Sequence, residues 1–542
     1  MPRSGAGVGP VPGRDGGHPV RPSRGKAVSP ATWGGAVGDR PLPLPAAAPW
    51  AHAHDRTPVP ARGSTVPLLQ EVHIGVQPLT RFLPLLGEAE VRRAEQLAAR
   101  TRDRLAGRTV WNVSSTPRGG GVAEMLHALL PYTRGAGIDT RWLVIAGTDA
   151  FFRITKRLHH ALHGSVGDGS PLGEAERATY DAVLATNAAE LVALVQPRDI
   201  VLLHDPQTAG LAPHMTRLGA YVLWRSHIGH DQTTAEVERG WRFLAPYLAQ
   251  VRAYIFSRAA YVPPICDPAR TAIIPPSIDP FTPKNQALDA ATVRAILVHA
   301  GLIEGPPGED SLTFLREDGS PGRVDRAADV LRLGRAPTWE TPLVVQISRW
   351  DPLKDHLGVM QGFAALLSQT DLGGAHLLLA GPTVHSVADD PEAAAVLDTM
   401  EDAWRQLPHG RRRRVHLASL PMEDPEENAA IVNALQRHAA VVVQKSLEEG
   451  FGLTVTEAMW KGRPVVASAV GGIQDQIEDG VHGLLVPDPT DLTAFGERLQ
   501  RVLEEPGLAA RLGSAAHQRV RERYLGIRHL AQYAELLARI DV

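Results

Sequence analysis

The sequence contains a single cysteine, Cys266, in 542 residues. One thiol cannot form an internal disulfide, so nothing in the fold depends on an oxidising compartment. Hydrophobic runs are also short. None approaches the ~18 consecutive apolar residues of a membrane-spanning helix, and the N-terminus lacks the apolar stretch of a signal peptide. We therefore expect a soluble, cytoplasmic protein in which Cys266 packs as an inert side chain.

Neither sign of charge is in large excess. The formal net charge is −3, with 21% charged and 44% hydrophobic residues, which is ordinary for a globular protein. A general nucleic-acid or membrane partner would need a concentrated basic face. The basic run at 411–414 is better interpreted as a solvated approach to a strand. The 22 histidines form no HExxH motif, and His159-His160 lies in a surface-like helical run, so we expect no metal site and no cofactor.

The length of the chain predicts two or three domains. Residues 1–62 are rich in Gly, Pro, Arg and Ala without periodic apolar positions, which predicts a disordered leader; a misassigned start explains them equally well. The periodic pattern then predicts an N-terminal Rossmann-like domain at 63–295 and a connection at 296–341. A second Rossmann-like domain follows at 342–510, and helices at 511–542 are expected to cross back to the N-terminal domain.

Short apolar runs, each ending in a turn and followed by a helical segment, repeat along both large domains. This is the rhythm of βαβ units, and it predicts a mainly parallel, doubly wound sheet covered by helices in each domain. Helical periodicity is clear at Glu88–Leu105 and Ala509–Ile540. We expect strands at Thr109–Val113, Thr140–Ile145, Asp199–Leu203, Ala220–Trp224 and Ala253–Phe256, and again at Leu343–Ile347, Ala375–Leu379, Arg414–Leu417, Ala440–Gln444 and Pro464–Ala467.

Ligands of open parallel sheets bind at the carboxyl ends of the strands, so the loops after these strands are the candidate sites. The first loop contains Gly119, Gly120 and Gly121 before a helix. Glycines let the backbone approach a ligand closely, and a helix start offers free N–H groups to phosphate or sugar oxygens. The pattern is not GxGxxG, and no acidic residue ends the next strand, so a nicotinamide dehydrogenase is disfavoured. An ordinary tight turn is the alternative.

Polar side chains end the third and fourth predicted strands. His204 and Asp205 follow one, and Arg225 and His227 follow the other. An imidazole and a carboxylate at a strand end can direct hydrogen bonds to sugar hydroxyls. A lone His-Asp pair more often belongs to a satisfied turn, but here two loops at the same sheet edge support each other.

Two cations follow the first strand of the second domain. Arg349 offers a planar fork suited to phosphate oxygens, and Lys354 adds a mobile point charge. Together they favour a diphosphate bound without a metal ion. Ordinary surface charges in a loop are the plainer alternative.

The segment 444–459 is the most informative. Glu449 and Glu457 lie on either side of a glycine turn and the start of a predicted helix. The turn aims the first carboxylate from a loop, and the second is expected about two helical turns in. Each carboxylate can then hold a different part of one extended ligand. The neighbouring positions expected to contact that ligand are Gly450, Phe451, Gly452, Gly471 and Gly472.

On these residues the chain resembles the retaining glycosyltransferases of the GT-B fold, whose hallmark is two glutamates bracketing seven residues. The resemblance implies an α/β architecture of two Rossmann-like, doubly wound domains facing each other across a cleft. It implies that Glu449 contacts the donor sugar and Glu457 the nucleotide ribose. Arg349 and Lys354 would hold the donor diphosphate, and the glycines at 119–121 would lie next to the phosphates and the reacting sugar.

A closer resemblance is to the trehalose glycosyltransferring synthases and the retaining trehalose phosphorylases. It rests on the phrases WNVSSTPRGGGVAEML, LHDPQTAGL, PSIDPFTPKN, QISRWDPLKD and QKSLEEGFGLTVTEAMWKGRPVVAS, and it runs from about Leu69 to the C-terminus. It implies reversible transfer of glucose from UDP-, ADP- or GDP-glucose to the anomeric hydroxyl of glucose, giving α,α-trehalose. Ser114 departs from the asparagine expected at its position, a small polar change.

In that picture His204, Asp205 and His227 lie near the reacting sugars, and Asp205 grips the acceptor. Retention without an enzymic nucleophile implies a front-face route. The leaving diphosphate accepts the acceptor's proton, and the two cations stabilise the developing charge. Small molecules are the expected partners, with no nucleic acid and no membrane; a homodimer is left open.

Three alternatives remain. A trehalose phosphorylase would use the same anion site for inorganic phosphate. Another nucleotide-sugar-dependent GT-B transferase, of sucrose or glycogen type, is disfavoured by the GGGVAEML and HDPQ phrases. A non-catalytic sugar-nucleotide sensor would not need Glu449, Glu457, Arg349 and Lys354 together.

Overall fold

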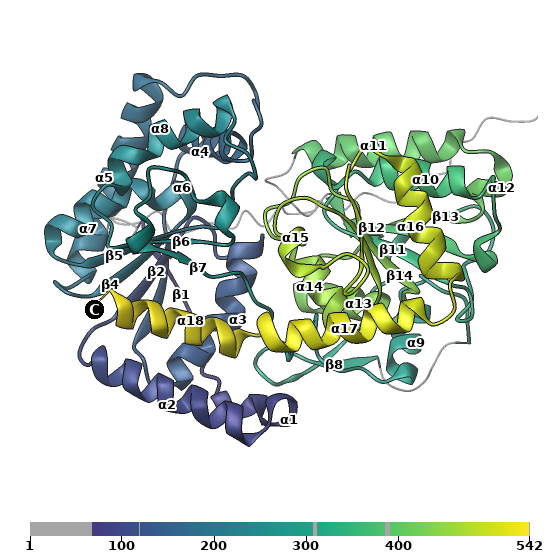
Figure 1. Cartoon of the computed structure of the whole chain (residues 1–542), viewed down its shortest axis with the longest axis horizontal. Helices are drawn as coiled ribbons and strands as arrows, with labels where there is room; N and C mark the ends of the chain where they lie inside the picture. Colours follow the sequence, from purple (N-terminus) through teal and green to yellow (C-terminus); the bar gives the residue numbers. More distant parts are fainter. Residues whose placement is uncertain (1–67, 119, 307–311, 385–390, 541–542) are drawn as a thin grey trace, which may run out of the picture. The chain divides into compact units, whose positions relative to one another are not determined.

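The computed structural model describes residues 68–118, 120–306, 312–384 and 391–540, all within one compact unit of the chain. Across these ranges it contains two seven-stranded sheets and a two-stranded sheet (Figure 1). The predicted α/β class is confirmed. The expected disordered leader at 1–62 lies outside the described residues, as does Gly119.

The first sheet has the strand order β1-β3-β2-β4-β5-β6-β7, and only β1 runs antiparallel to its neighbour. Its parallel strands follow the flavodoxin-like doubly wound order, which reverses direction between β2 and β4. The strands are β1 (Gln70–Val72), β2 (Val110–Ser114), β3 (Thr140–Val144), β4 (Ile200–His204), β5 (Tyr221–Ser226), β6 (Ala253–Phe256) and β7 (Thr271–Ile273).

The second sheet has the order β10-β13-β12-β11-β14-β15-β16, and only β10 is antiparallel. Its parallel strands follow the Rossmann order, which reverses between β11 and β14. The strands are β10 (Asp329–Leu331), β11 (Leu343–Ile347), β12 (His376–Pro382), β13 (Val415–Leu420), β14 (Val441–Gln444), β15 (Val465–Ser468) and β16 (Leu484–Val486), and the separate hairpin is β8 (Thr313–Leu315) with β9 (Pro321–Arg323).

The strands predicted from apolar runs are present in the structure. Every residue of β11, β14 and β15 is buried, because helices cover both faces of a parallel sheet and leave no polar side to its strands. All ten predicted strands occur, with ends shifted by at most three residues. The three-residue strands β1, β7, β10 and β16 were not predicted, since so short a segment carries no periodic signal.

Helices of the first half cover its sheet. Thr148 and Thr234 cap the starts of α4 and α8 by accepting hydrogen bonds from the amides of Phe151 and Val237. Cys266 is buried, and burial raises the pKa of its thiol to about 12. The helices are α1 (Leu83–Leu86), α2 (Glu88–Arg104), α3 (Gly121–Gly135), α4 (Asp149–Leu162), α5 (Glu174–Leu194), α6 (Asp205–Thr208), α7 (Ala212–Leu218) and α8 (Ala235–Leu248).

The second half is covered in the same way. These helices are α9 (Ala290–His299), α10 (His356–Leu366), α11 (Pro391–Gln406), α12 (His409–Arg412), α13 (Pro425–His438), α14 (Leu453–Trp460), α15 (Ile473–Gln476), α16 (Leu492–Glu504), α17 (Leu508–Arg523) and α18 (Gly526–Arg539). Among the described residues, no helix combines the length and the apolar character needed to cross a membrane.

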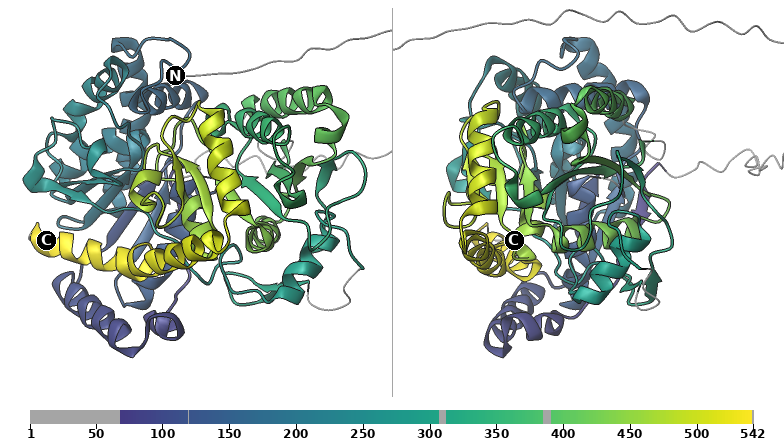
Figure 2. Two further views of the ribbon diagram at one scale, coloured as in Figure 1. Left: turned by 45° about the vertical axis from the view of Figure 1, so that its right-hand side comes forward. Right: turned by 90° about the vertical axis from the view of Figure 1, so that its right-hand side faces the viewer.

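The predicted helix at 509–540 is in fact two helices, separated by Tyr524 and Leu525. The first, α17, packs against α14 beside the second sheet, whereas α18 packs against α2 and α3 beside the first (Figure 2). The break lets one C-terminal segment contact both sheets.

The expected boundaries around 296–341 differ from the structure. Helix α9 runs through the boundary at residue 295 and packs against α13 of the second half. Strand β10 lies in the expected connection, yet it pairs with β13 as an edge strand of the second sheet. The polar and glycine-rich residues around α9 and β10 obscured the patterns of both elements in the sequence.

Candidate active site

Four loops that carry expected site residues lie where the strand order of each sheet reverses. In the first sheet they follow β2 and β4, next to Gly121 and His204. In the second sheet they follow β11 and β14, and they contain Lys354 and Glu449. Ligands of doubly wound sheets bind in the crevice beyond such reversal points. The topology therefore singles out these loops.

Glu449 and Lys354 form an ion pair between the loops after β14 and β11. The Lys354 ammonium lies 2.9 and 2.8 Å from the two carboxylate oxygens of Glu449. The Ser446 hydroxyl donates to one of these oxygens at 3.0 Å. The lysine and glutamate side chains are 16% and 12% exposed. A carboxylate held in this way has a fixed orientation and still offers lone pairs to the hydroxyl groups of a ligand.

The turn after Glu449 is fastened to the first half of the molecule. The hydroxyl of Tyr261, at the end of the 3-10 turn η3 (Ala259–Tyr261), donates to the carbonyls of Glu449 at 3.1 Å and Gly450 at 2.6 Å. A Cβ on Gly229 would lie 2.2 Å from the Tyr261 ring. Only glycine at that position lets the ring reach the Glu449 turn.

Close packing explains the glycines at 471 and 472. A Cβ on Gly471 would lie 1.6 Å from the carbonyl oxygen of Glu449, and one on Gly472 would lie 2.7 Å from the Cα of Phe451. Both glycines thus support the Glu449 turn from behind, which corrects the expectation of a separate ligand-binding turn there. Gly452 has a φ of +84° and forms the N-cap of α14, a backbone conformation that favours glycine.

Two helix N-termini meet beside this turn. Gly120, with a φ of +81°, forms the N-cap of α3, and Gly121 is the first residue of that helix. A Cβ on Gly121 would lie 3.6 Å from the Leu453 side chain, which begins α14. Each helix start presents unpaired N–H groups and the positive end of a dipole. Their proximity creates an environment that favours an anion.

His204 and His227 form a hydrogen-bonded chain with Asn112. The His204 Nδ1 and His227 Nε2 atoms are 2.9 Å apart, and the His204 Nε2 lies 3.2 Å from the Asn112 Oδ1. Burial, assisted by the Arg225 charge, lowers the pKa of His204 to about 3 and that of His227 well below its usual value. Both rings are therefore neutral at pH 7. Because Asn112 Oδ1 only accepts, His204 carries its proton on Nε2 and accepts at Nδ1 from His227.

Asp205 follows His204 at the tip of β4. It adopts a φ of +62°, and one of its carboxylate oxygens accepts a hydrogen bond from the His227 amide at 2.7 Å. Burial raises the pKa of Asp205 to about 7, although the His227 N–H and the Arg225 charge oppose the shift. A half-buried carboxyl that titrates near neutrality suits contact with a sugar hydroxyl. It accepts a hydrogen bond when it is ionised and can donate one when it is protonated.

Arg225 does not have the expected contacts of a substrate-binding residue. Its guanidinium is buried and donates to the Tyr533 hydroxyl at 2.6 Å and to the Ile274 carbonyl at 2.9 Å. It also lies 2.9 Å from the His529 Nε2. Tyr533 and His529 belong to α18, so Arg225 anchors that helix. A strand-end position alone does not reveal which way the side chain turns.

Arg349 lies near the C-terminal turn of α4. Its side chain is 60% exposed, with Nη2 at 3.4 Å from the Asp351 carboxylate. This turn carries two histidines, His159 and His163, whose ring centroids are 4.7 Å apart. Burial lowers the pKa of both histidines, with Arg349 contributing at His159 and Lys354 at His163, whose pKa falls to about 4. His159 is half-buried, which corrects the expectation of a surface-like run.

Glu457 is buried in a cluster of opposite charges that reaches the surface at Glu124. It is the fifth residue of α14, just over one helical turn in rather than two. Lys284 lies 3.5 Å from its carboxylate and 3.1 Å from that of Glu124. Burial raises the pKa of Glu457, and Lys284 and Lys461 oppose the shift. Burial also lowers the pKa of Lys461 to about 7; its ammonium donates to the Asn285 side chain at 3.0 Å.

Several residues of this site were not identified from the sequence. Asn112, Tyr261 and Lys284 contact partners distant in the chain, so no local spacing marks them. His163 contacts the nearby His159 and is linked to a distant segment by the charge of Lys354. Asn112 lies in the phrase WNVSS and Lys284 in the phrase PSIDPFTPKN. The family resemblance carried by these phrases was therefore the signal that could have identified both residues. Among the residues that the structure describes, no three His, Cys, Asp or Glu side chains are grouped as metal ligands.

Comparisons with family models assign both halves of the chain. The family described as "Trehalose synthase, N-terminal domain" matches residues 112–263. The family described as "Glycosyl transferases group 1" matches residues 413–519. These ranges contain the loops after β4 and β14 respectively.

Individual relatives span most of the chain. A trehalose synthase of Pyrococcus horikoshii is 33% identical over 86% of this chain and 98% of its own length, and one of Rubrobacter xylanophilus is 32% identical over 87% and 99%. Among solved structures, a UDP-forming trehalose-phosphate synthase of Burkholderia xenovorans, in complex with glucose-6-phosphate, has a TM-score of 0.59 at 17% identity, covering 80% of this chain and 100% of its own. This likeness and the two doubly wound sheets confirm the predicted GT-B fold.

Proposed function

We propose that this chain, which belongs to the trehalose synthase family of group 1 glycosyltransferases, transfers glucose from a nucleoside-diphosphate glucose to free glucose. The product is α,α-trehalose, formed reversibly and with retention at the donor carbon. The observation that carries this proposal is the Glu449–Lys354 ion pair beside the N-termini of α3 and α14.

The donor diphosphate fits the cationic side of this arrangement. Lys354 and Arg349 supply positive charge, and the two helix starts supply N–H groups. These donors, from the segment after β11 and from the two helix starts, can together neutralise a diphosphate without a metal ion. Glu449 is held next to Lys354, so its free lone pairs fit the hydroxyl groups of the donor glucose.

The acceptor fits the chain of Asp205, His227 and His204. All three lie at the ends of β4 and β5, and the histidines are neutral. The Asp205 carboxylate, held by the His227 amide, accepts a hydrogen bond from an acceptor hydroxyl. In the reaction, the bond from donor C1 to the phosphate oxygen breaks and a bond from C1 to the acceptor oxygen forms.

The acceptor hydroxyl loses its proton in the same step. On the retained face, the leaving diphosphate oxygen receives it, so no separate protein base is required. Lys354 and Arg349 stabilise the negative charge that develops on the leaving group, and fixed donors of this kind cost no reorganisation during the reaction.

The first test is a donor screen with the full chain. UDP-, ADP- and GDP-glucose are each offered with glucose, and the disaccharide is identified by its anomeric NMR signals. We expect α,α-trehalose from at least one donor, and the loss of this product in Lys354→Met. No trehalose from any donor, or a β-linked product, would refute the proposal.

A phosphorylase reaction is the second candidate. A trehalose phosphorylase of Pleurotus pulmonarius is 26% identical over 75% of this chain and 54% of its own length. The same anion site could take inorganic phosphate. Incubating the protein with trehalose plus phosphate, and separately with trehalose plus a nucleoside diphosphate, distinguishes the two. We expect glucose release in the second mixture, whereas release in the first alone would assign the phosphorylase.

A further inference from the structure

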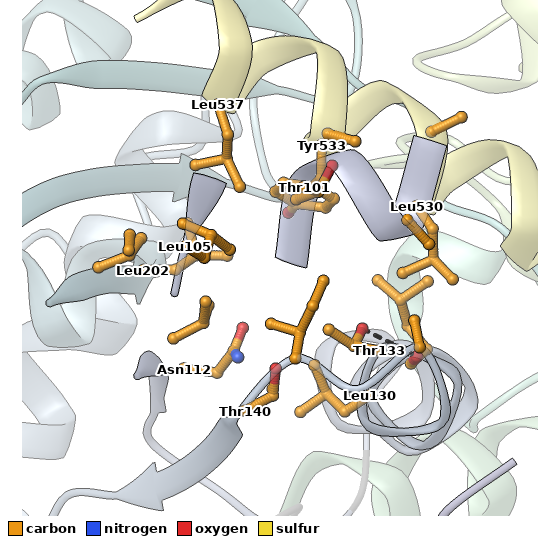
Figure 3. Close-up of a pocket in the computed structure, with 18 of the residues that line it drawn as sticks. Thr101, Leu105, Asn112, Leu130, Thr133, Thr140, Leu202, Leu530, Tyr533 and Leu537 are labelled. Carbon is orange, nitrogen blue, oxygen red and sulfur yellow. Dashed lines mark hydrogen bonds between the residues drawn. The ribbon is translucent and has the colours of Figure 1, made fainter. Parts of the chain in front are cut away.

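A cavity of about 100 Å³ lies beneath α18, between that helix, α2, α3 and the first sheet (Figure 3). Leu530, Tyr533 and Leu537 of α18 border one side, and Asn112 and Thr140 border the sheet side. No role in the proposed glucosyl transfer involves this space.

The cavity wall is almost entirely apolar. Leucine, isoleucine, valine, methionine and alanine side chains from the three helices and from β2, β4 and β5 form most of it. The hydroxyls of Thr101 and Thr133 donate to carbonyls of their own helices, those of Leu97 and Leu129. The Tyr533 oxygen accepts from Arg225. These polar groups already have hydrogen-bond partners, so a molecule in the cavity need not pair with them.

Two polar groups in the wall are not satisfied. The Asn112 Nδ2 and the Thr140 Oγ1 have no hydrogen-bond partner among the residues that the structure describes, and each side chain belongs to a residue only 2% exposed. Leaving a buried donor unpaired costs about 1–3 kcal/mol. Two such groups bordering one apolar cavity indicate that this space has a polar partner when it is occupied.

We propose that this cavity is a second ligand site, for a compact and mostly apolar molecule that carries one hydroxyl or carbonyl oxygen. The oxygen accepts from the Asn112 amide and meets the Thr140 hydroxyl, which can donate or accept. The hydrocarbon part contacts the leucines of α3 and α18. An apolar cavity of about 150 Å³ accommodates benzene, and this one is smaller at about 100 Å³. A single six-membered ring therefore fits only with outward movement of the half-buried side chains at its rim.

The cavity has an accessible rim. Leu97 and Ala98 of α2, and Leu530 and Ala531 of α18, are half-buried rather than fully covered. A small molecule can therefore enter between these two helices by limited side-chain movement.

The site is also connected to the active-site histidines. Asn112 faces the cavity with its Nδ2, while its Oδ1 lies 3.2 Å from His204. A bound oxygen atom would hold the amide in the orientation that accepts from His204. The ligand and the catalytic loops thus share one side chain.

The test uses phenol as the probe and toluene as its match in size without an oxygen. Binding to the full chain is measured by titration calorimetry and by saturation-transfer NMR. We expect one phenol per chain, bound more tightly than toluene. In Ala534→Leu, which fills the cavity, phenol affinity should fall at least tenfold. The control is Ala538→Leu on the exposed side of α18, which should bind phenol as the wild type does.

A second variant tests the hydrogen bond separately from the packing. Thr140→Val keeps the size of the side chain and removes its hydroxyl, so the preference for phenol over toluene should fall about fivefold. Thermal unfolding checks that each variant is folded. Absence of saturable phenol binding in the wild type, or equal binding in Ala534→Leu and Ala538→Leu, would overturn the proposal.

Discussion

At the scale of single residues, the candidate site combines fixed charges with neutral polar groups. The Lys354 ammonium neutralises Glu449, whereas burial keeps His204 and His227 uncharged. The Lys354–Glu449 pair carries no net charge, so the positive potential offered to a diphosphate comes from Arg349 and the N-termini of α3 and α14, with neutral hydrogen-bonding groups on the other side. Two consequences can be measured.

Replacing Lys354 with Met should lower kcat by about 10²–10³-fold, because the loss of one preorganised electrostatic donor typically reduces the rate by that factor. Steady-state kinetics with saturating donor and acceptor measures it. Lys156→Met is the matched control: Lys156 is half-exposed and only 3.7 Å from Glu392, an ion pair of little energetic value. Equal rates in the two variants would remove Lys354 from the diphosphate site.

Replacing Asp205 with Asn should stabilise the folded chain at high pH. The folded pKa of about 7 exceeds the usual ~3.9 of an unfolded Asp, so the folded state holds this proton more tightly. Its contribution to stability is complete below about pH 4 and is lost as pH rises through 7. Asn stays neutral and keeps an oxygen for the His227 amide.

Thermal unfolding between pH 5 and 9 measures this effect. The unfolding temperature of Asp205→Asn should exceed that of the wild type increasingly as pH rises, while Asp398→Asn, at an exposed position of α11, should show no such trend. A constant difference at all pH values would contradict a raised pKa at Asp205.

At the scale of elements, the precision of the site comes from contacts between loops. The Glu449 turn rests on Gly471 and Gly472 behind it and on Tyr261 from the other half. Each contact joins segments distant in the chain. The position of the Glu449 carboxylate therefore depends on groups that never touch a ligand.

Tyr261→Phe tests this dependence. It removes one hydroxyl that serves two carbonyls, so kcat/KM for the donor should fall about five- to tenfold, the effect of one to two ordinary hydrogen bonds. The KM for the acceptor should stay unchanged. Tyr254→Phe is the matched control, since its hydroxyl donates to the Leu248 carbonyl at 2.9 Å within the first half. A general loss of stability without the kinetic change would show a purely structural role.

At the scale of the whole molecule, the two sheets are joined at several points. Arg258 of the first half contacts Asp475 of the second at 3.1 Å. The α17–α18 segment packs on both halves, and the Arg225 guanidinium anchors its second helix. A ligand held by loops of both sheets should therefore stabilise the molecule as a unit.

We expect the nucleoside diphosphate of the active donor, at a hundred times its Kd, to stabilise the chain by about 2.7 kcal/mol. The shift in unfolding temperature measures this effect. The nucleoside without phosphates is the control and should give a smaller shift. If Lys354→Met retained the full shift, the diphosphate would be bound elsewhere.

Local sequence patterns were enough to predict the helices and strands and the polar residues at their ends. Continuous apolar runs predicted β11, β14 and β15, because a strand covered on both faces must be apolar on both. The loops that follow predicted Lys354, Glu449 and Gly120 as site candidates, because strand ends converge at one sheet edge.

Which side chains contact each other depends on how the helices, strands and loops pack. Arg225, predicted to follow a strand, is the last residue but one of β5 and turns toward α18, and Gly471 and Gly472 support a turn where a ligand contact was expected. Asn112, Tyr261 and Lys284 gained their partners from distant segments. Local spacing encodes the period of a strand or helix, whereas hydrogen bonds between loops depend on distances that exist only once the sheets have packed.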